Sequence, residues 1–440
     1  MLSLVWFRRD LRVDDHPALS RAAAEGPVLP VYIADPEEWA QGDLAARHLA
    51  FLDESIRSLR EDLAQCGQPL ILRTGDAVEV LTRLHAKHRF TRIVTHPETG
   101  DGGARARFAR VAGWACGHGL GWLVTGAEPS ALLPPPVLRP VTEATGALPG
   151  LRALELAEDR CPYRQPGGGR AARDLLDSWL ASRGENHALR QVTTLAAERS
   201  GTRLSPHLAF GVISSRRVRE AMAARVGQPG WATPLRGLGQ TLALRDAAHA
   251  AAPAPALSGR ADCGPWALGE TGLPIVDASM RALAARGWAC GPSRALLAGV
   301  GIQLLRLSPA AVGLRLAQLS TDHDPAILWR EIGRIAGSRV PDPVAAGQRL
   351  DPDATFLRRW LPELAPVPDA FVHAPWLWPA ARSALAGRYP EPVIDPRSAA
   401  REARARRVRQ APPRPRDPTA LLVEPPLRAR PQGPQMLLDL

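Results

Sequence analysis

The first 130 residues alternate between short apolar runs and amphipathic helical patterns, and this alternation limits the possible folds more than any other feature. Residues 45–63, for example, place leucine and isoleucine at steps of three and four, the spacing of one buried helix face. Strands separated by helices pair in a parallel sheet, because each helix returns the chain to the same end of the sheet. We therefore predict a doubly wound α/β domain over residues 1–130, with strands at residues 2–7, 28–33, 70–73, 92–95 and 120–125.

The whole chain has 440 residues, which exceeds the size at which one hydrophobic core usually keeps growing, so we expect more than one domain. Strand signals become scarce after residue 130. Residues 131–170 are rich in proline and glycine and predict an interdomain linker. Helical spacing of apolar residues recurs through residues 171–400, whereas residues 401–440 predict a basic Pro/Arg-rich tail that is partly disordered. The predicted fold class is α/β plus all-α: an N-terminal doubly wound parallel sheet domain followed by a helical domain.

Composition indicates the partners and the compartment. The formal net charge of +11 favours contact with polyanions, so DNA is an expected partner. The five cysteines lie far apart without zinc-type spacing, so we expect reduced thiols and no metal site. The sequence shows no secretory leader pattern and no apolar run of membrane-spanning length. We expect a cytoplasmic monomer that makes no membrane contact.

Several motifs place charged and hydroxyl side chains at fixed spacing. The first, at residues 6–19 (WFRRDLRVDDHPAL), is an apolar strand that runs into a charged turn at the carboxyl edge of the predicted sheet, where α/β domains build sites. Others are TRLSPHLAFG at 202–211, GETGLPIVDASMR at 269–281, DHDP at 322–325, FLRRWLPEL at 356–364 and HAPW at 373–376. Together these motifs resemble a divergent bacterial branch of the DNA photolyase/cryptochrome family, over residues 1–408.

The resemblance implies that the helical domain binds FAD in a compact, U-shaped pocket. Arg245 and Arg294 would then face the pyrophosphate and the developing negative charge of the ring. Each residue taken alone has an alternative role as a helix cap or a buried ion-pair partner. The resemblance also allows a second, antenna chromophore of unknown identity, and it leaves the catalytic residues unassigned. The implied cofactor-binding residues are Thr202, Arg203, Leu204, Ser205, Arg245, Trp288, Arg294, Asp322, Asp324 and Leu328.

The chain departs from the family pattern at the positions that bind the DNA lesion and at those that take part in electron transfer. Leu328 occupies the position that faces flavin N5 and can neither donate to nor accept from it. Thr241 and Leu244 stand near the positions of the catalytic Glu and the stacking Trp of dimer-specific members, so a flipped base lacks an aromatic face. Residues 290–295 lack the amide and thioether that hold a pyrimidine dimer. The three relay-tryptophan positions hold Ala256, Pro309 and Ile332, and the remaining candidates are Trp266, Trp288 and Trp329.

Three functions are consistent with these residues. The leading hypothesis is a light-driven flavoenzyme, a DNA photolyase-like carbon–carbon lyase in which excited, reduced FAD donates an electron to a DNA lesion. The second is a cryptochrome-like blue-light receptor, which the altered lesion pocket favours. The third is a degenerate flavin domain that holds no chromophore. The basic composition does not distinguish the first two, whereas the colour of the purified protein distinguishes both from the third.

Overall fold

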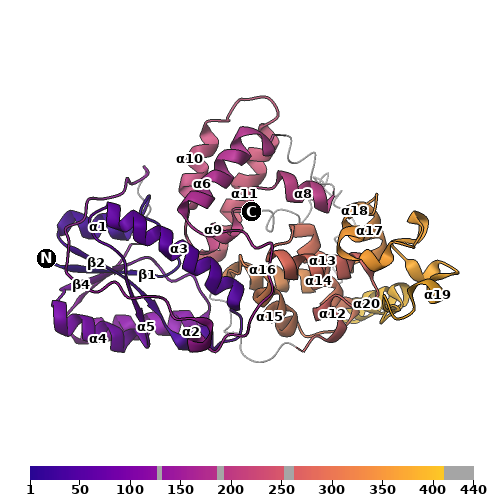
Figure 1. The fold of residues 1–440 in the computed structure, drawn as a ribbon, viewed down its shortest axis with the longest axis horizontal. Coiled ribbons are helices and arrows are strands. Elements are labelled where there is room, and N and C mark those ends of the chain that lie inside the picture. The colour runs from indigo at the N-terminus through magenta and orange to yellow at the C-terminus, as the bar shows by residue number, and fades with distance from the viewer. Residues whose placement is uncertain (126–130, 186–192, 252–261, 411–440) are drawn as a thin grey trace, which may run out of the picture.

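The computed structural model describes residues 1–125, 131–185, 193–251 and 262–410, and it has an α/β part and a helical part side by side (Figure 1). The sheet has five parallel strands in the order β3-β2-β1-β4-β5. Their bounds are β1 Ser3–Phe7, β2 Val28–Ala34, β3 Ile71–Thr74, β4 Arg92–Thr95 and β5 Gly121–Val124. The order reverses beside β1, which pairs with both β2 and β4, and this arrangement confirms the predicted doubly wound sheet.

Helices cover both faces of the sheet because alternate side chains of β1 point to opposite sides. Val5 and Phe7 belong to one core with α1 and α3, whereas Leu4 and Trp6 belong to another with α4 and α5. Figure 1 shows the two pairs of helices above and below the strands. The helices of this part are α1 Pro17–Glu25, α2 Pro36–Trp39, α3 Ala46–Gln65, α4 Ala77–His88 and α5 Gly102–Gly117.

The proline- and glycine-rich segment that follows runs along the α/β part. Leu72 donates its backbone N–H to Thr145 at 2.6 Å, and Leu138 donates to Cys66 at 2.6 Å. Gly146 has a φ of +71°, and a Cβ there would lie 2.2 Å from the Leu72 carbonyl oxygen, so this close approach requires glycine. The segment contains one short 3₁₀ helix, Leu151–Leu154.

The remaining described residues are helical and contain no strand, as predicted. The first core reaches into this part, because it contains Leu204, Phe210 and Leu242 as well as Phe51 of α3, and a second core begins at Cys263. No described helix is long and apolar enough to cross a membrane. The helices are α6 Gly169–Ser178, the π-helix Trp179–Arg183, α8 Thr194–Ser200, α9 Ser205–Ala209, α10 Ser215–Ala223, α11 Ala232–Ala250, α12 Gly264–Leu268, α13 Pro274–Arg286, α14 Gly291–Gly299, the π-helix Val300–Leu304, α15 Pro309–Leu319, α16 Pro325–Ala336, α17 Pro343–Leu350, α18 Thr355–Trp360, α19 Ala381–Leu385 and α20 Pro396–Gln410, with 3₁₀ turns at Pro362–Leu364, Asp369–Phe371 and Pro375–Leu377.

Candidate functional site

A group of buried charges surrounds the turn that leads into α16. Asp322 forms an ion pair with Arg294 of α14. Two side chains of α11 reach Asp324: Arg245 Nη2 and His249 Nε2 each lie 2.8 Å from its Oδ2. Pro325 is the first residue of α16, a position that favours proline because a backbone N–H there would have no partner within the helix. Both carboxylates therefore lie in the turn just before the helix. The turn is therefore clamped between α14 and α11.

The charge of Asp324 is stabilised by its partners. Burial alone would raise the pKa of Asp324, but the charges of Arg245 and His249 outweigh it and hold that pKa well below its usual range. Arg245 is itself buried, and it also donates to the Leu208 carbonyl at 2.8 Å. This second bond ties α11 to α9. The carboxylate is therefore ionised at neutral pH and can act as a hydrogen-bond acceptor.

A cavity opens beside this turn. Arg294, Asp322, Asp324, Leu328 and Glu331 line it together with apolar side chains of α15 and α16. Asp322, Asp324 and Glu331 each have one buried carboxylate oxygen that accepts no hydrogen bond from the described residues. Buried acceptors normally have partners. The cavity thus suits a ligand that carries several N–H or O–H groups.

A second group of polar side chains lies at residues 202–205, where α9 begins. Thr202 and Ser205 are both buried, and the Ser205 hydroxyl has no partner among the described residues. Arg203 has a left-handed backbone with φ +61°, a conformation that costs about 1 kcal/mol or more for a residue other than glycine. Strain of this kind is concentrated at functional sites.

The Arg203 side chain lies against an aromatic ring. Its guanidinium carbon is 4.3 Å from the ring centroid of Trp288, and its Nε donates to Gln165 Oε1 at 3.1 Å. Burial lowers the pKa of Arg203 to about 10. In the described structure Arg203 forms no ion pair with a carboxylate. A partly desolvated cation without an acidic partner suits an anionic ligand such as a phosphate.

The α/β part holds the 322–324 turn from the opposite side. Asp43 Oδ2 lies 2.9 Å from His323 Nε2, and Arg9 Nη1 donates to the His323 carbonyl at 3.0 Å. His48 of α3 contacts the Ser320 carbonyl at 2.8 Å. These bonds connect residues that lie about 270 or more positions apart in the sequence. The buried carboxylates therefore depend on the interface between the two parts.

A cleft lies at the carboxyl edge of the sheet. Its charged lining comprises five carboxylates and three arginines, several of them paired: Arg8 with Glu98, and Arg107 with Glu38 at 2.8 Å. Burial raises the pKa of Asp35 in this cleft. The indole N–H groups of Trp6 and Trp39 are buried without a partner in the described residues. The cleft can therefore receive a polar ligand, with acidic groups in excess.

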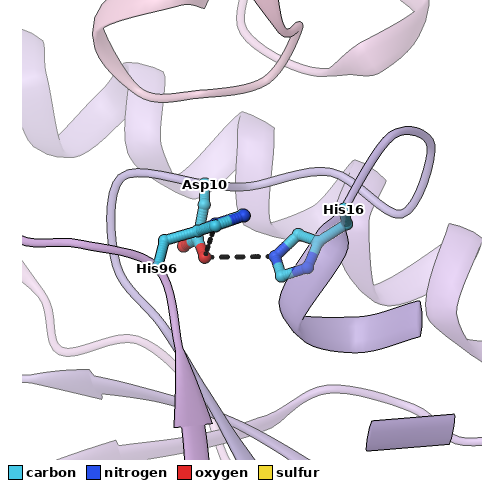
Figure 2. Close-up of side chains that lie close together, drawn as sticks. All are labelled: Asp10, His16 and His96. Carbon is cyan, nitrogen blue, oxygen red and sulfur yellow. Dashed lines mark hydrogen bonds and ion pairs between the residues drawn. The ribbon is translucent and has the colours of Figure 1, made fainter. Parts of the chain in front are cut away.

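Asp10, His16 and His96 meet just beyond the ends of β1 and β4, and their composition resembles a metal site (Figure 2). Asp10 Oδ2 lies 3.1 Å from His16 Nε2 and 2.7 Å from His96 Nδ1. The other ring nitrogen, His16 Nδ1, accepts the Leu19 backbone N–H at 2.9 Å and caps α1. His16 therefore carries its hydrogen on Nε2, which leaves that atom no lone pair for a metal. The cluster fits a structural hydrogen-bond network.

Family models match both parts of the chain. Residues 3–134 match the DNA photolyase model, and residues 242–409 match the model of the FAD-binding domain of DNA photolyase. The chain belongs to the photolyase/cryptochrome family. This membership confirms the resemblance that the motifs carry.

Relatives of both kinds within the family resemble the chain over most of its length. The deoxyribodipyrimidine photo-lyase of Halobacterium salinarum is 28% identical, with 90% of this chain and 96% of that protein covered. Cryptochrome-1 of Arabidopsis thaliana is 28% identical, with 89% and 68% covered. An archaeal photolyase from Sulfolobus tokodaii, solved with two FAD molecules, has a TM-score of 0.74 at 23% identity, with 93% of this chain and 100% of that chain covered. The last comparison shows the fold.

The photolyase-type positions inferred from the sequence fall into two neighbouring groups. Arg294, Asp322, Asp324 and Leu328 line one cavity, and Arg245 pairs with Asp324. Residues 202–205 and Trp288 form the other group, and the charge of Asp322 also acts on Arg203. Motif comparison did not identify three further side chains around the cavity: His249, His323 and Glu331. His249 lies four residues after Arg245, on the same helix face, and this spacing was the available signal.

The residues that differ from the family pattern lie mostly in the helical part of the structure. Thr241 is buried and donates to the Gly237 carbonyl at 2.9 Å, and Leu244 is half-buried on α11. Pro309 begins α15, Ile332 lies in the second core, and Ala256 lies outside the described residues. Trp266 is buried and donates to the Leu297 carbonyl at 3.1 Å. The Trp329 ring lies half-buried against Gly313.

Proposed function

We propose that this chain binds FAD non-covalently between α9, α11, α14 and α16 and acts as a light-driven, photolyase-like flavoprotein. The observation that carries the proposal is the cavity in which Asp322, Asp324 and Glu331 each present a buried oxygen that has no partner among the described residues. Buried acceptors of this kind need donors from a ligand. The bound FAD would supply a light-absorbing redox centre that donates one electron.

Different side chains suit different parts of FAD. The hydroxyls of Thr202 and Ser205 and the guanidinium of Arg203 suit the pyrophosphate, because neutral donors and a cation with no carboxylate partner among the described residues all favour an anion. Asp322 and Asp324 accept hydrogen bonds from ribose or ring groups. Arg245 pairs with Asp324 and Arg294 pairs with Asp322, and these ion pairs hold the carboxylates in place, while Leu204, Trp288 and Leu328 exclude water around them.

The altered lesion pocket bears on whether this redox centre serves repair or signalling. A photolyase-type lyase must hold a flipped base, and Leu244 offers no ring for stacking. We propose that the chain retains light-driven electron transfer to DNA lesions, with weak repair of cyclobutane dimers. The second candidate, a cryptochrome-like receptor without repair activity, is favoured by the same Leu244 position. The net charge of +11 agrees with DNA as the partner of the first candidate.

The cleft at the sheet edge is our proposed site for a second, antenna chromophore. The indole N–H groups of Trp6 and Trp39 have no partner in the described part of the chain, and the position of the cleft at a strand-order reversal is typical of ligand sites in α/β sheets. Carboxylates outnumber arginines there, which disfavours a chromophore that brings phosphate groups. Mass spectrometry of the chromophores released on unfolding tests this, and a phosphate-bearing second chromophore would contradict it.

The colour and flavin content of the purified full-length protein test the main proposal. We expect yellow protein with about one FAD per chain after reconstitution. Asp324→Ala should lower the affinity by tenfold or more, because a hydrogen bond to a charged group contributes about 1.5–3 kcal/mol. Asp246→Ala, on the exposed face of α11, is the matched control. Protein that stays colourless after reconstitution would support the degenerate domain.

A repair assay then separates the two remaining candidates. Ultraviolet-damaged oligonucleotides are illuminated with the flavin-loaded protein, and dimer loss is measured against a dark control. Slow, light-dependent loss supports the lyase. No loss with any lesion, from protein that is loaded and photoreducible, supports the receptor.

A further inference from the structure

The cavity beside Asp322 contains one buried carboxylate to which the proposed function assigns no group of the flavin. Glu331 lies on α16, and its side chain is only 3% exposed. Its Oε2 accepts from Arg334 Nη2 at 2.8 Å, whereas its Oε1 is buried without a partner in the described residues. Both Glu331 and Leu328 line the cavity.

The helix geometry aims Glu331 at the turn that contains Leu328. The two residues are three positions apart and therefore share a helix face. Side chains on a helix lean toward its N-terminus, so a residue covers the turn that precedes its own Cα. Leu328 is an apolar side chain at the position that, by resemblance, faces flavin N5. Glu331 thus supplies the polar group that is missing one turn earlier.

We propose that Glu331 is the hydrogen-bond acceptor for the N–H group of the reduced flavin ring in this chain. The inference rests on the proposed binding of FAD in this cavity. Glu331 forms an ion pair with Arg334, and a carboxylate can only accept, so the group opposite its Oε1 must be a donor. N5 of the flavin ring carries a hydrogen only after reduction. Glu331 therefore favours the reduced, N5-protonated ring over the oxidised ring, and it replaces the interaction that Leu328 cannot make.

Other charges around the cavity already have partners. From α14, Arg294 faces the cavity and pairs with Asp322; from α11, Arg245 and His249 pair with Asp324. His323, in the turn before α16, faces Asp43, and Arg315 of α15 donates to the Ala267 carbonyl. Arg334, on α16 itself, is the one charged partner of Glu331 among the described residues. Substitution of Glu331 therefore leaves the remaining pairs of the cavity in place.

The test compares the affinity of the full-length apoprotein for oxidised and for reduced FAD, measured without oxygen. Glu331→Leu should weaken binding of reduced FAD by about tenfold or more relative to oxidised FAD. Glu331→Gln keeps the shape and one acceptor and should fall between the variant with leucine and the wild type. Glu363→Gln is the matched control, because Glu363 also pairs with an arginine, Arg281, but lies outside the cavity.

A spectroscopic measurement distinguishes this role from simple support of the fold. The infrared difference spectrum between oxidised and reduced protein should contain a carboxylate band that disappears in Glu331→Gln and remains in Glu363→Gln. Equal weakening for both redox states, or an unchanged band, would overturn the inference while FAD binding stands. Wild-type protein that binds neither form of FAD would overturn the proposed function as well.

Discussion

Replacing Asp324 with asparagine should destabilise the helical part by far more than an ordinary surface substitution. Asp324 is the shared partner of Arg245 and His249, and both Asp324 and Arg245 are buried. The substitution keeps the side-chain shape but leaves the guanidinium without its counter-charge. Removing one partner of a buried ion pair typically costs about 3–5 kcal/mol. Because Arg245 keeps its bond to the Leu208 carbonyl, we expect a loss of about 3 kcal/mol.

Thermal melting of the flavin-free protein, followed by circular dichroism, measures this loss. For a region of 150–250 residues, 3 kcal/mol corresponds to a fall in Tm of roughly 6–12 °C. Asp246→Asn is the control, since Asp246 pairs with Arg219 on the exposed side of α11 and such pairs contribute about 0–1 kcal/mol. Equal melting temperatures for the two variants would refute the argument that the Asp324 cluster is a buried, interdependent ion pair.

The same variant has a predictable pH dependence. The folded-state pKa of Asp324 lies well below its usual value of about 3.9, so its contribution to stability is fully present above about pH 4. That contribution is lost as the pH falls further, toward the folded-state pKa. The stability difference between wild type and Asp324→Asn should therefore be smaller at pH 3 than at pH 5. A difference that grows in acid would contradict this sign.

Three further predictions concern the domain interface, the lesion and the electron route. Asp43→Asn should weaken FAD binding severalfold although Asp43 lies outside the cavity, because it removes the charge opposite His323; a titration of apoprotein with FAD measures this. Leu244→Trp should raise affinity for a dimer-containing oligonucleotide by about ten- to a hundredfold over wild type in a mobility-shift titration, since base stacking contributes about 1–3 kcal/mol. Trp329→Phe should slow or abolish photoreduction with an external thiol, recorded as the decay of oxidised-flavin absorbance; unchanged kinetics would exclude Trp329 from the relay.

The fold was predictable from the sequence because its strongest signals are local. The expected strand at residues 28–33 is β2, Val28–Ala34, and the helical stripe at residues 45–63 lies in α3, Ala46–Gln65. Both depend on periodicity within a few turns of chain. Of the predicted basic tail, residues 401–410 lie in α20, whereas residues 411–440 lie outside the described part. Packing of α3 against α9 and α11 in one core was not predictable, because no local pattern specifies it.

The candidate site was only partly predictable, for a related reason. Motif comparison identified Asp322 and Asp324, because the four-residue run DHDP is a short, local pattern. It did not identify Glu331, because a single glutamate in a helix is usually solvated, and only burial distinguishes this one. The contact between Asp43 and His323 spans 280 positions and has no counterpart in the spacing of any motif.

The geometry of residues 323–325 explains why the two parts of the chain should act together. Pro325 lines the sheet-edge cleft with Arg9 and Asp43, while the preceding Asp324 and His323 line the cavity next to α16. One short segment therefore forms the wall between the two sites, and Arg9 and Asp43 hold it by hydrogen bonds from the cleft side. A ligand that changed these two bonds would change the free energy of placing Asp324. By thermodynamic reciprocity, filling the cavity would alter the affinity of the cleft by the same factor.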